Sequence, residues 1–286
     1  VLNMTQPAAS KLLKDLEDAL GVALFDRLPR GMRVNWYGDT MIRHARAALS
    51  TISQAHNELQ AAKSGQFGQV HMGAITAPGL QMVPQAIDSL LNTHPHLQIS
   101  VHIAPSNLLV ERLVRGKLDI VVGRLAPDTH SAGLRYETVG DELIVAASRV
   151  AHPLLTQEGL SLPDLMACRW ILPPAGSALR YRFDLMVQQL NVAAPHNSME
   201  TSSLLLSTKM LQQSDMVTVM AAEVAHYYAS HGLLAVLPVT LSCQMEPFGL
   251  ITSRERALSP AAKTVLAHLK QSASAIYGSA FPPSAP

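Results

Sequence analysis

The segment from residue 37 to residue 64 constrains the fold most, because it predicts one long helix whose apolar side needs a partner. It contains no proline and no glycine in its interior. Seven residues recur at spacings of 4, 3, 4, 3, 4 and 3, which is the heptad pattern of paired helices. The members of this seam are Met41, Ala45, Ala48, Ile52, Ala55, Leu59 and Ala62. We predict that the seam forms a homodimer; the alternative is a surface helix that lies on its own domain.

The sequence that follows alternates short apolar strands with helices. The first set has strands at 70–75, 97–103 and 118–122, with helices at 79–91 and 108–114. The second set has strands at 170–172, 217–220 and 234–237, with helices at 179–190, 203–212 and 223–230, before a last strand at 248–252 and helix at 259–273. This alternation predicts an α/β fold with parallel strands and helical crossovers. The Gly/Ser/Pro-rich tail, residues 279–286, is predicted to be disordered.

Composition restricts the possible partners of the chain. Hydrophobic residues make up 48% of its 286 positions, yet no apolar run reaches the length of about 18 residues that a membrane span needs. The formal net charge is +1, so a surface that binds nucleic acid must be local. Cys168 and Cys243 are far apart, which predicts buried, reduced thiols. The chain begins at Val1 inside an apparent element, without a signal peptide, and we interpret it as a fragment.

The first 36 residues have the pattern of a DNA-reading helix followed by a basic hairpin. Pro7 suits the first turn of a helix, and Gly21 suits its end. Polar residues four apart near the start form one face, and the opposite face is leucine-rich. The predicted DNA contacts are Thr5, Gln6, Pro7, Ser10, Lys11 and Lys14 on the helix, and Arg27, Arg30 and Arg33 at the hairpin. The alternative is an ordinary amphipathic surface helix.

A family resemblance favours the first interpretation. The run Thr5, Gln6, Pro7, Ala8, Ala9, Ser10, followed by Leu16, Glu17, Leu20, Gly21, Leu24, Phe25, Arg27, Arg30 and Gly31, resembles the winged helix-turn-helix of LysR-type transcriptional regulators. The sequence departs from the family pattern at Asn35, Trp36 and Tyr37. The resemblance implies that the helices preceding this one lie outside the sequence. We therefore expect the fragment to bind its operator poorly.

The resemblance continues through most of the chain. Residues 69–76, 93–97, 116–120 and 151–154 resemble the effector domain of the same family, which implies a fold like type 2 periplasmic binding proteins: two α/β subdomains with a cleft between them. The implied crossings lie near 143–148 and 248–253. The expected domains are a partial winged helix-turn-helix (1–36), a linker helix (37–66) and a bilobal effector domain (67–278). Within the last, subdomain I comprises 67–147 and 253–278, and subdomain II comprises 148–252.

Turns between strands and helices supply the candidate ligand contacts. Helix N-termini present unpaired N–H groups, and hydroxyl groups at such turns suit a small anionic or strongly polar ligand. Arg124, just after a strand, can pair with a carboxylate. The predicted effector-binding residues are Thr76, Ala77, Ser106, Asn107, Arg124, Gly176, Ser177, Thr201 and Ser202. The alternative is that these residues only cap helices.

We predict a cytoplasmic transcription factor that binds double-stranded promoter DNA and an organic acid or other polar metabolite. It would be a homodimer or tetramer, and it would contact RNA polymerase if it is an activator; the sequence does not distinguish an activator from a repressor. A solute-binding protein and an enzyme on the same two lobes are the alternatives. The heptad helix argues against the first, and the absence of a catalytic constellation argues against the second. No cofactor or metal is predicted, because the histidine pairs lack a third ligand.

Overall fold

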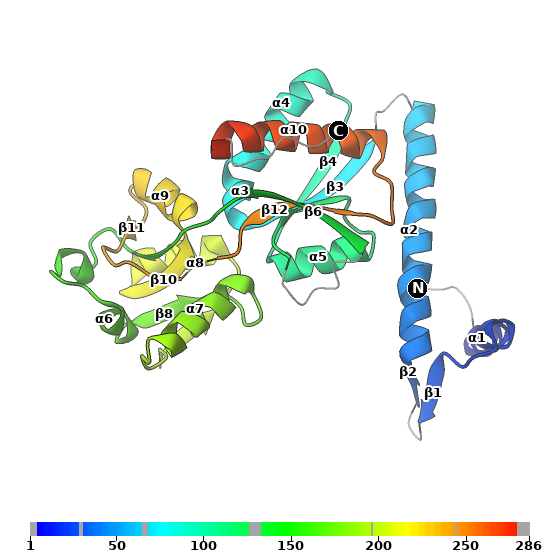
Figure 1. The fold of residues 1–286 in the computed structure, drawn as a ribbon, viewed down its shortest axis with the longest axis horizontal. Coiled ribbons are helices and arrows are strands. Elements are labelled where there is room, and N and C mark those ends of the chain that lie inside the picture. Colours follow the sequence, from blue (N-terminus) through cyan, green and yellow to red (C-terminus); the bar gives the residue numbers. More distant parts are fainter. Residues whose placement is uncertain are drawn as a thin grey trace. The chain divides into compact units, whose positions relative to one another are not determined.

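The computed structural model describes residues 5–28, 31–64, 68–125, 133–195, 197–243 and 245–278. The chain forms two compact units, residues 1–56 and 57–286, which are described separately below. Figure 1 labels their elements. Arg30 and the tail for which we predicted disorder lie outside the described residues, and so does the side chain of Ala62.

The first unit contains the predicted helix, hairpin and start of the long helix. Helix α1 (Gln6–Leu20) has proline in its first turn and ends at Gly21, whose φ of 70° is the left-handed conformation that glycine adopts readily. Strands β1 (Phe25–Leu28) and β2 (Gly31–Val34) pair antiparallel. Helix α2 (Trp36–Ser64) begins one residue before the predicted start. These elements confirm the predicted secondary structure of the N-terminal region.

Asn35 joins the hairpin to α2. Its side-chain amide donates to the carbonyl of Ala23, and its side-chain oxygen accepts from the backbone N–H of Gly38. A Cβ at Gly38 would lie 2.1 Å from the Leu24 carbonyl oxygen, so a side chain at this position would collide with the backbone. Asn35, where the sequence departs from the family pattern, is therefore the cap that begins α2.

The second unit consists of two lobes, each built on a five-stranded sheet. The first sheet has the order β4-β3-β5-β12-β6. Its strands are β3 (Gln69–Ala74), β4 (Gln98–Ile103), β5 (Ile120–Gly123), β6 (Leu134–Gly140) and β12 (Phe248–Ser253). The first three are mutually parallel, and β12 runs antiparallel to both β5 and β6. The parallel crossovers confirm the predicted α/β class.

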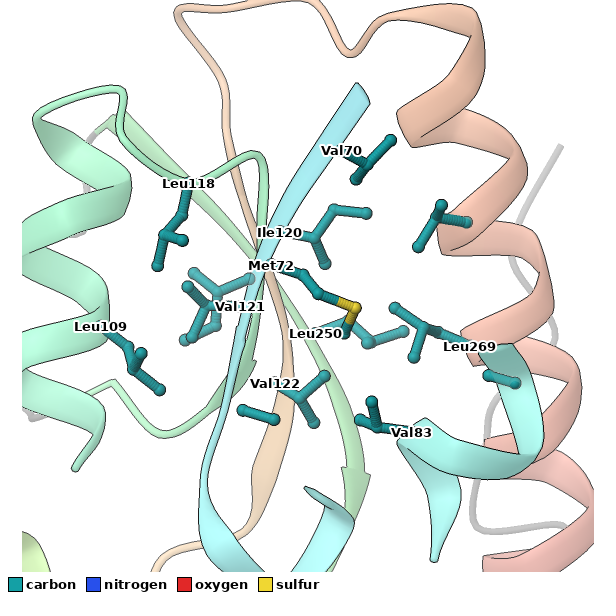
Figure 2. Close-up of a cluster of buried hydrophobic side chains, with 14 of the residues drawn as sticks. Val70, Met72, Val83, Leu109, Leu118, Ile120, Val121, Val122, Leu250 and Leu269 are labelled. Atoms are coloured by element: carbon teal, nitrogen blue, oxygen red, sulfur yellow. The ribbon is translucent and has the colours of Figure 1, made fainter. Parts of the chain in front are cut away.

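Helices cover both faces of this first sheet. They are α3 (Thr76–Leu80), α4 (Met82–Thr93), α5 (Ser106–Val114) and α10 (Pro260–Tyr277). Figure 2 shows Leu109 of α5 on one side of β3, and Val83 of α4 and Leu269 of α10 on the other. Met72 and Leu250 fill the interior between them.

The second sheet has the order β11-β7-β10-β8-β9. Its strands are β7 (Ile144–Ser148), β8 (Arg169–Leu172), β9 (Ser198–Glu200), β10 (Met216–Ala221) and β11 (Ala235–Val236), and its helices are α6 (Leu162–Met166), α7 (Ala178–Gln189), α8 (Leu204–Gln213) and α9 (Ala222–Ser230). Trp170 anchors the core of this lobe: its ring centroid lies 5.0 Å from that of Phe183, and its indole N–H donates to the Leu165 carbonyl.

The structure differs from the predictions in three respects. Strand β6 was not predicted, because residues 134–140 mix charged and apolar side chains, and the short elements α6 and β9 were not predicted either. The predicted helix at 79–91 is two helices, α3 and α4, separated at Gln81. The chain also passes from one lobe to the other one strand earlier than expected, at both crossings. Strand β7 pairs with β10 and β11 of the second sheet, and β12 pairs with β5 and β6 of the first sheet. Because pairing partners, not sequence position, assign a strand to a sheet, 144–148 belongs to the second lobe and 248–253 to the first.

Candidate functional site

A cavity of about 270 Å³ lies between the two lobes. The first lobe contributes residues around Thr76, Ser106 and Arg124, and the second contributes 171–179 and 201–224. Much of the wall is apolar, including Ile75, Ile103 and Leu172. Ligand sites typically occupy roughly 300–1,000 Å³, so this cavity suits a small metabolite.

Seven residues with hydroxyl groups line the cavity: Thr76, Ser106, Ser177, Thr201, Ser202, Ser207 and Thr218. Thr76, Ser202 and Ser207 form no side-chain hydrogen bond with any described residue. The hydroxyl oxygens of Ser106 and Ser177 accept from backbone N–H groups, which leaves their protons available for a ligand.

Three helices of eight or more residues begin at the cavity wall. Ser106 is the first residue of α5, Ala178 of α7 and Leu204 of α8, and all three line the cavity. The partial positive charge at a helix N-terminus favours a negatively charged group there. The first turns of these three helices therefore border one cavity.

Arg124 and Glu142 form a buried ion pair in the cavity wall. Arg124 Nη2 lies 2.8 Å from Glu142 Oε2, and Arg124 Nε donates to the backbone carbonyl of Glu246 at 2.7 Å. The guanidinium also lies over the Phe248 ring. Burial raises the pKa of Glu142, and Arg124 partly offsets this effect. We had expected Arg124 to offer a full positive charge to a ligand carboxylate. The pair is formally neutral when ionised, so Arg124 does not present an uncompensated charge.

The structure places six of the nine predicted effector residues in the cavity wall: Thr76, Ser106, Arg124, Ser177, Thr201 and Ser202. Ala77, Asn107 and Gly176 do not line it. Ala77 is buried and packs against α9, and Gly176 forms a left-handed turn before α7. Sequence reasoning missed Glu142, Ser207, Thr218 and Met245. Ser207 carried a detectable signal, because it lies one helical turn after the hydroxyl cluster that ends at Ser203.

In the first unit, the predicted DNA contacts on α1 are all exposed. Gln6, Ser10 and Lys14 share one face by their spacing. The opposite face is also uncovered, since Leu12, Leu16 and Leu20 are 57%, 41% and 41% exposed. In the hairpin, Arg33 faces Asp26 across the strands at 3.5 Å, while Arg27 forms no ion pair with a described residue. Glu17 accepts from the backbone N–H groups of Leu24 and Phe25, so it fixes the approach to the hairpin.

The seam of α2 lies in solvent along most of its described length. Met41 is half-buried, whereas Ala45, Ala48, Ile52, Ala55 and Leu59 are exposed. Ile52 and Leu59 are 65% and 70% exposed. An uncovered heptad seam of this kind is the surface that a partner helix would bury.

These features define a class: a protein in which an exposed helix, a β-hairpin and a long helix precede a two-lobed domain with a cavity between its lobes. Two family models match the chain. One, described as the LysR substrate binding domain, covers residues 63–274, and the other, the bacterial regulatory helix-turn-helix protein of the lysR family, covers residues 1–39. The chain therefore belongs to the LysR family of transcriptional regulators, whose members have a DNA-binding helix-turn-helix and an effector-binding domain and are not enzymes.

Relatives support the same assignment. The chain is 38% identical to the HTH-type transcriptional regulator GbpR of Azospirillum brasilense over 270 residues, which are 94% of this chain and 79% of that protein. It is 31% identical to GalR of Pseudomonas putida over 94% of this chain and 67% of that protein.

Solved structures share the fold. A full-length variant of OxyR from Pseudomonas aeruginosa gives a TM-score of 0.63 at 21% identity, covering 99% of this chain and 90% of that one. The effector-binding domain of QuiR in complex with shikimate gives 0.62 at 15% identity, covering 73% and 99%. Within the described residues, no helix meets the length and hydrophobicity that a membrane crossing requires.

Proposed function

We propose that this regulator senses a small polar or anionic metabolite, in the simplest case an organic acid, in the cavity between its lobes. The observation that carries the proposal is the convergence of three helix N-termini and seven hydroxyl-bearing side chains on one small cavity. Capping alone explains some of these hydroxyls, but Thr76, Ser202 and Ser207 cap nothing that is described. Their free hydroxyls are suited to a ligand.

The ion pair in the wall favours a ligand that carries both an acid group and hydroxyl groups. The start of α7 and the loop before α8, with Ser177, Thr201 and Ser202, suit a carboxylate. Glu142 is an acceptor and suits a hydroxyl donor. That the related effector domain of QuiR was solved with shikimate is compatible with this chemistry.

The proposed mechanism couples the cavity to DNA. A ligand bound by both lobes favours the arrangement in which they close on it, by as much as its affinity differs between the two arrangements. In a homodimer or tetramer assembled through the α2 seam, such a change would alter the spacing of the α1 helices on double-stranded promoter DNA. We propose that the protein works in the cytoplasm and that it contacts RNA polymerase if it activates transcription.

The test measures ligand-dependent thermal stabilisation of the full chain with a panel of small hydroxy acids, since binding to the folded state raises its apparent stability. The double variant Thr76→Val and Ser202→Ala should weaken a stabilising ligand about tenfold or more, because it removes two hydrogen bonds. The control is Thr156→Val, an exposed threonine outside the cavity. A stabilising acid that responds equally to both variants would place the effector elsewhere.

A further inference from the structure

A second concave site lies on the first lobe and shares no residue with the interlobe cavity. It is a groove of about 530 Å³ between α10 and the edge strand β6. Its lining is Arg135, Glu137, Leu250, Thr252, Ser253, Arg254, Arg256, Ala257, Leu258, Lys263, Leu266 and Lys270. Five of these residues are cationic and one is anionic, although the whole chain has a net charge of only +1.

The register of the sheet explains this concentration of charge. Arg135 pairs with Thr252, and Glu137 pairs with Leu250, so these four side chains share the face of the sheet that α10 covers. On α10, Lys263, Leu266 and Lys270 are three and four residues apart, so they share the face of the helix that borders the groove. The apolar floor is Leu250, Leu258 and Leu266.

Two of the cations are already engaged. Lys270 Nζ lies 2.6 Å from Glu137 Oε2, so these two lining residues form a neutral pair. Arg256 donates to the carbonyl oxygens of Leu113 and Leu118, and burial lowers its pKa. Arg256 therefore serves the junction of α5 and β5, and its charge still adds to the groove.

The other three cations are exposed and have no described counter-ion. Arg135, Arg254 and Lys263 form no ion pair with any described residue. Glu255, the neighbouring carboxylate in the loop, lies against Gly133 and does not line the groove. Three free cations around an apolar floor form a site for a ligand with several negative charges.

We propose that this groove binds a small molecule carrying two or more negative charges, a phosphate ester or a polycarboxylate, at a site separate from the interlobe cavity. Three cations within one groove gain more from one multiply charged ligand than from a single carboxylate. The concave shape of the groove and its leucine floor favour a small molecule over the flat contact of a protein partner.

The experiment is calorimetric titration of the full chain with inorganic pyrophosphate and with citrate, at constant ionic strength. We expect one of the two probes to bind with one site per chain. The double variant Arg254→Gln and Lys263→Gln should weaken that binding at least about tenfold, because it removes two charged contacts. The control double variant Arg169→Gln and Lys209→Gln removes the same two charges from exposed positions on the second lobe, and binding should be unchanged.

The outcomes also separate this site from the proposed effector site. In the Thr76→Val and Ser202→Ala variant, binding of the probe should persist. Its loss there would place the probe in the interlobe cavity and overturn the proposal. Equal weakening in both charge variants would show a general charge effect and overturn it too. The proposal is also overturned if neither probe binds. If a hexaglutamate peptide binds and the small anions do not, the groove is a contact for a protein partner and the proposal is overturned as well.

Discussion

The two compact units differ in where their apolar side chains lie. The effector unit encloses its apolar residues in continuous cores, with Trp170, Phe183, Met72 and Leu109 fully buried. Among the described residues 5–28 and 31–56 of the first unit, only Leu24 and Gly38 are buried. Leu12, Leu16 and Leu20 on α1 and most of the described seam on α2 are instead exposed.

This difference shows how the two units obtain their stability. Buried apolar area is the main stabilising contribution in a folded domain. The effector unit has that contribution within its own chain. The helices of the first unit present apolar faces that only another surface can bury, so the stability of this unit depends on what it contacts.

The largest expected effect tests the core of the effector unit. Phe183→Ala should lower the free energy of unfolding by about 3–5 kcal/mol, because it opens a cavity beside Trp170. Leu16→Ala on α1 should change it by less than about 1 kcal/mol, because that side chain is already solvated. Urea unfolding of the full chain, followed by far-UV circular dichroism, measures both.

If Phe183→Ala and Leu16→Ala lower the free energy of unfolding by similar amounts, the two units do not differ as described. That result would mean that the leucine face of α1 is covered in solution. Trp170→Phe is the conservative control for the core. It retains an aromatic ring and removes the hydrogen bond to Leu165, so its effect should be smaller than that of Phe183→Ala.

The next effect tests the seam. Ile52→Asp should weaken homodimer formation about 100-fold, because it would bury an unpaired charge at a heptad position. Ser53→Asp introduces the same charge at an exposed neighbour outside the seam and should leave assembly unchanged. Sedimentation equilibrium over a range of concentrations measures both. Equal dissociation in the two variants would show that the seam is not the interface.

Periodicity allowed most elements of the fold to be predicted, because burial imposes it on every amphipathic helix and strand. It failed where burial does not produce a pattern. Strand β6 was missed because Arg135 and Glu137 face a charged groove. The division of the lobes was misplaced because strand pairing depends on residues distant in sequence, as in the pairs of Thr218 with Ala147 and Leu250 with Val122.

The candidate site shows the same limit. Hydroxyls at turns between strands and helices could be found because their positions are local. Glu142 could not, because only the fold places it beside Arg124, which is 18 residues away. In the sequence, Asn35 was only a departure from the family pattern. Its hydrogen bonds to Ala23 and Gly38 in the structure identify it as the cap of α2.

A smaller effect tests which exposed groups of α1 read DNA. Gln6→Ala should cost about 1–3 kcal/mol on the specific operator, with little change on unrelated DNA, because a glutamine that reads a base edge contributes only at its own site. Lys14→Gln should weaken binding to both sequences and reduce the salt slope by about 1, as expected for a phosphate contact. Asp18→Asn, past the contact end, serves as the control.

Fluorescence anisotropy at several salt concentrations separates these contributions. A Gln6→Ala variant that weakens both DNA sequences equally would contradict a base-reading role. The same result from Asp18→Asn would show that the whole surface of α1, and not its N-terminal end, determines affinity.

The smallest effect concerns pH and the contact between α9 and α10. The Tyr277 hydroxyl donates to Glu223 Oε2 at 3.2 Å, and Glu223 Oε1 is buried without a described partner. Burial raises the pKa of Glu223, the bond from Tyr277 opposes this, and the charge of Glu142 raises it further. A raised carboxyl pKa means that the folded state favours the protonated form.

The contribution of Glu223 to stability is therefore complete below the ordinary glutamate pKa and is lost as pH rises through the raised value. Glu223→Gln, which does not titrate, should match the wild type at low pH and become more stable above that window. Thermal midpoints measured across pH should show this divergence, while Glu158→Gln, at an exposed carboxylate in the second lobe, should follow the wild type. If Glu223→Gln instead matches the wild type at low pH and becomes less stable than the wild type as pH rises, the ionised carboxylate is the form that the α9–α10 contact requires, and the hydrogen bond from Tyr277 outweighs the cost of burying the charge.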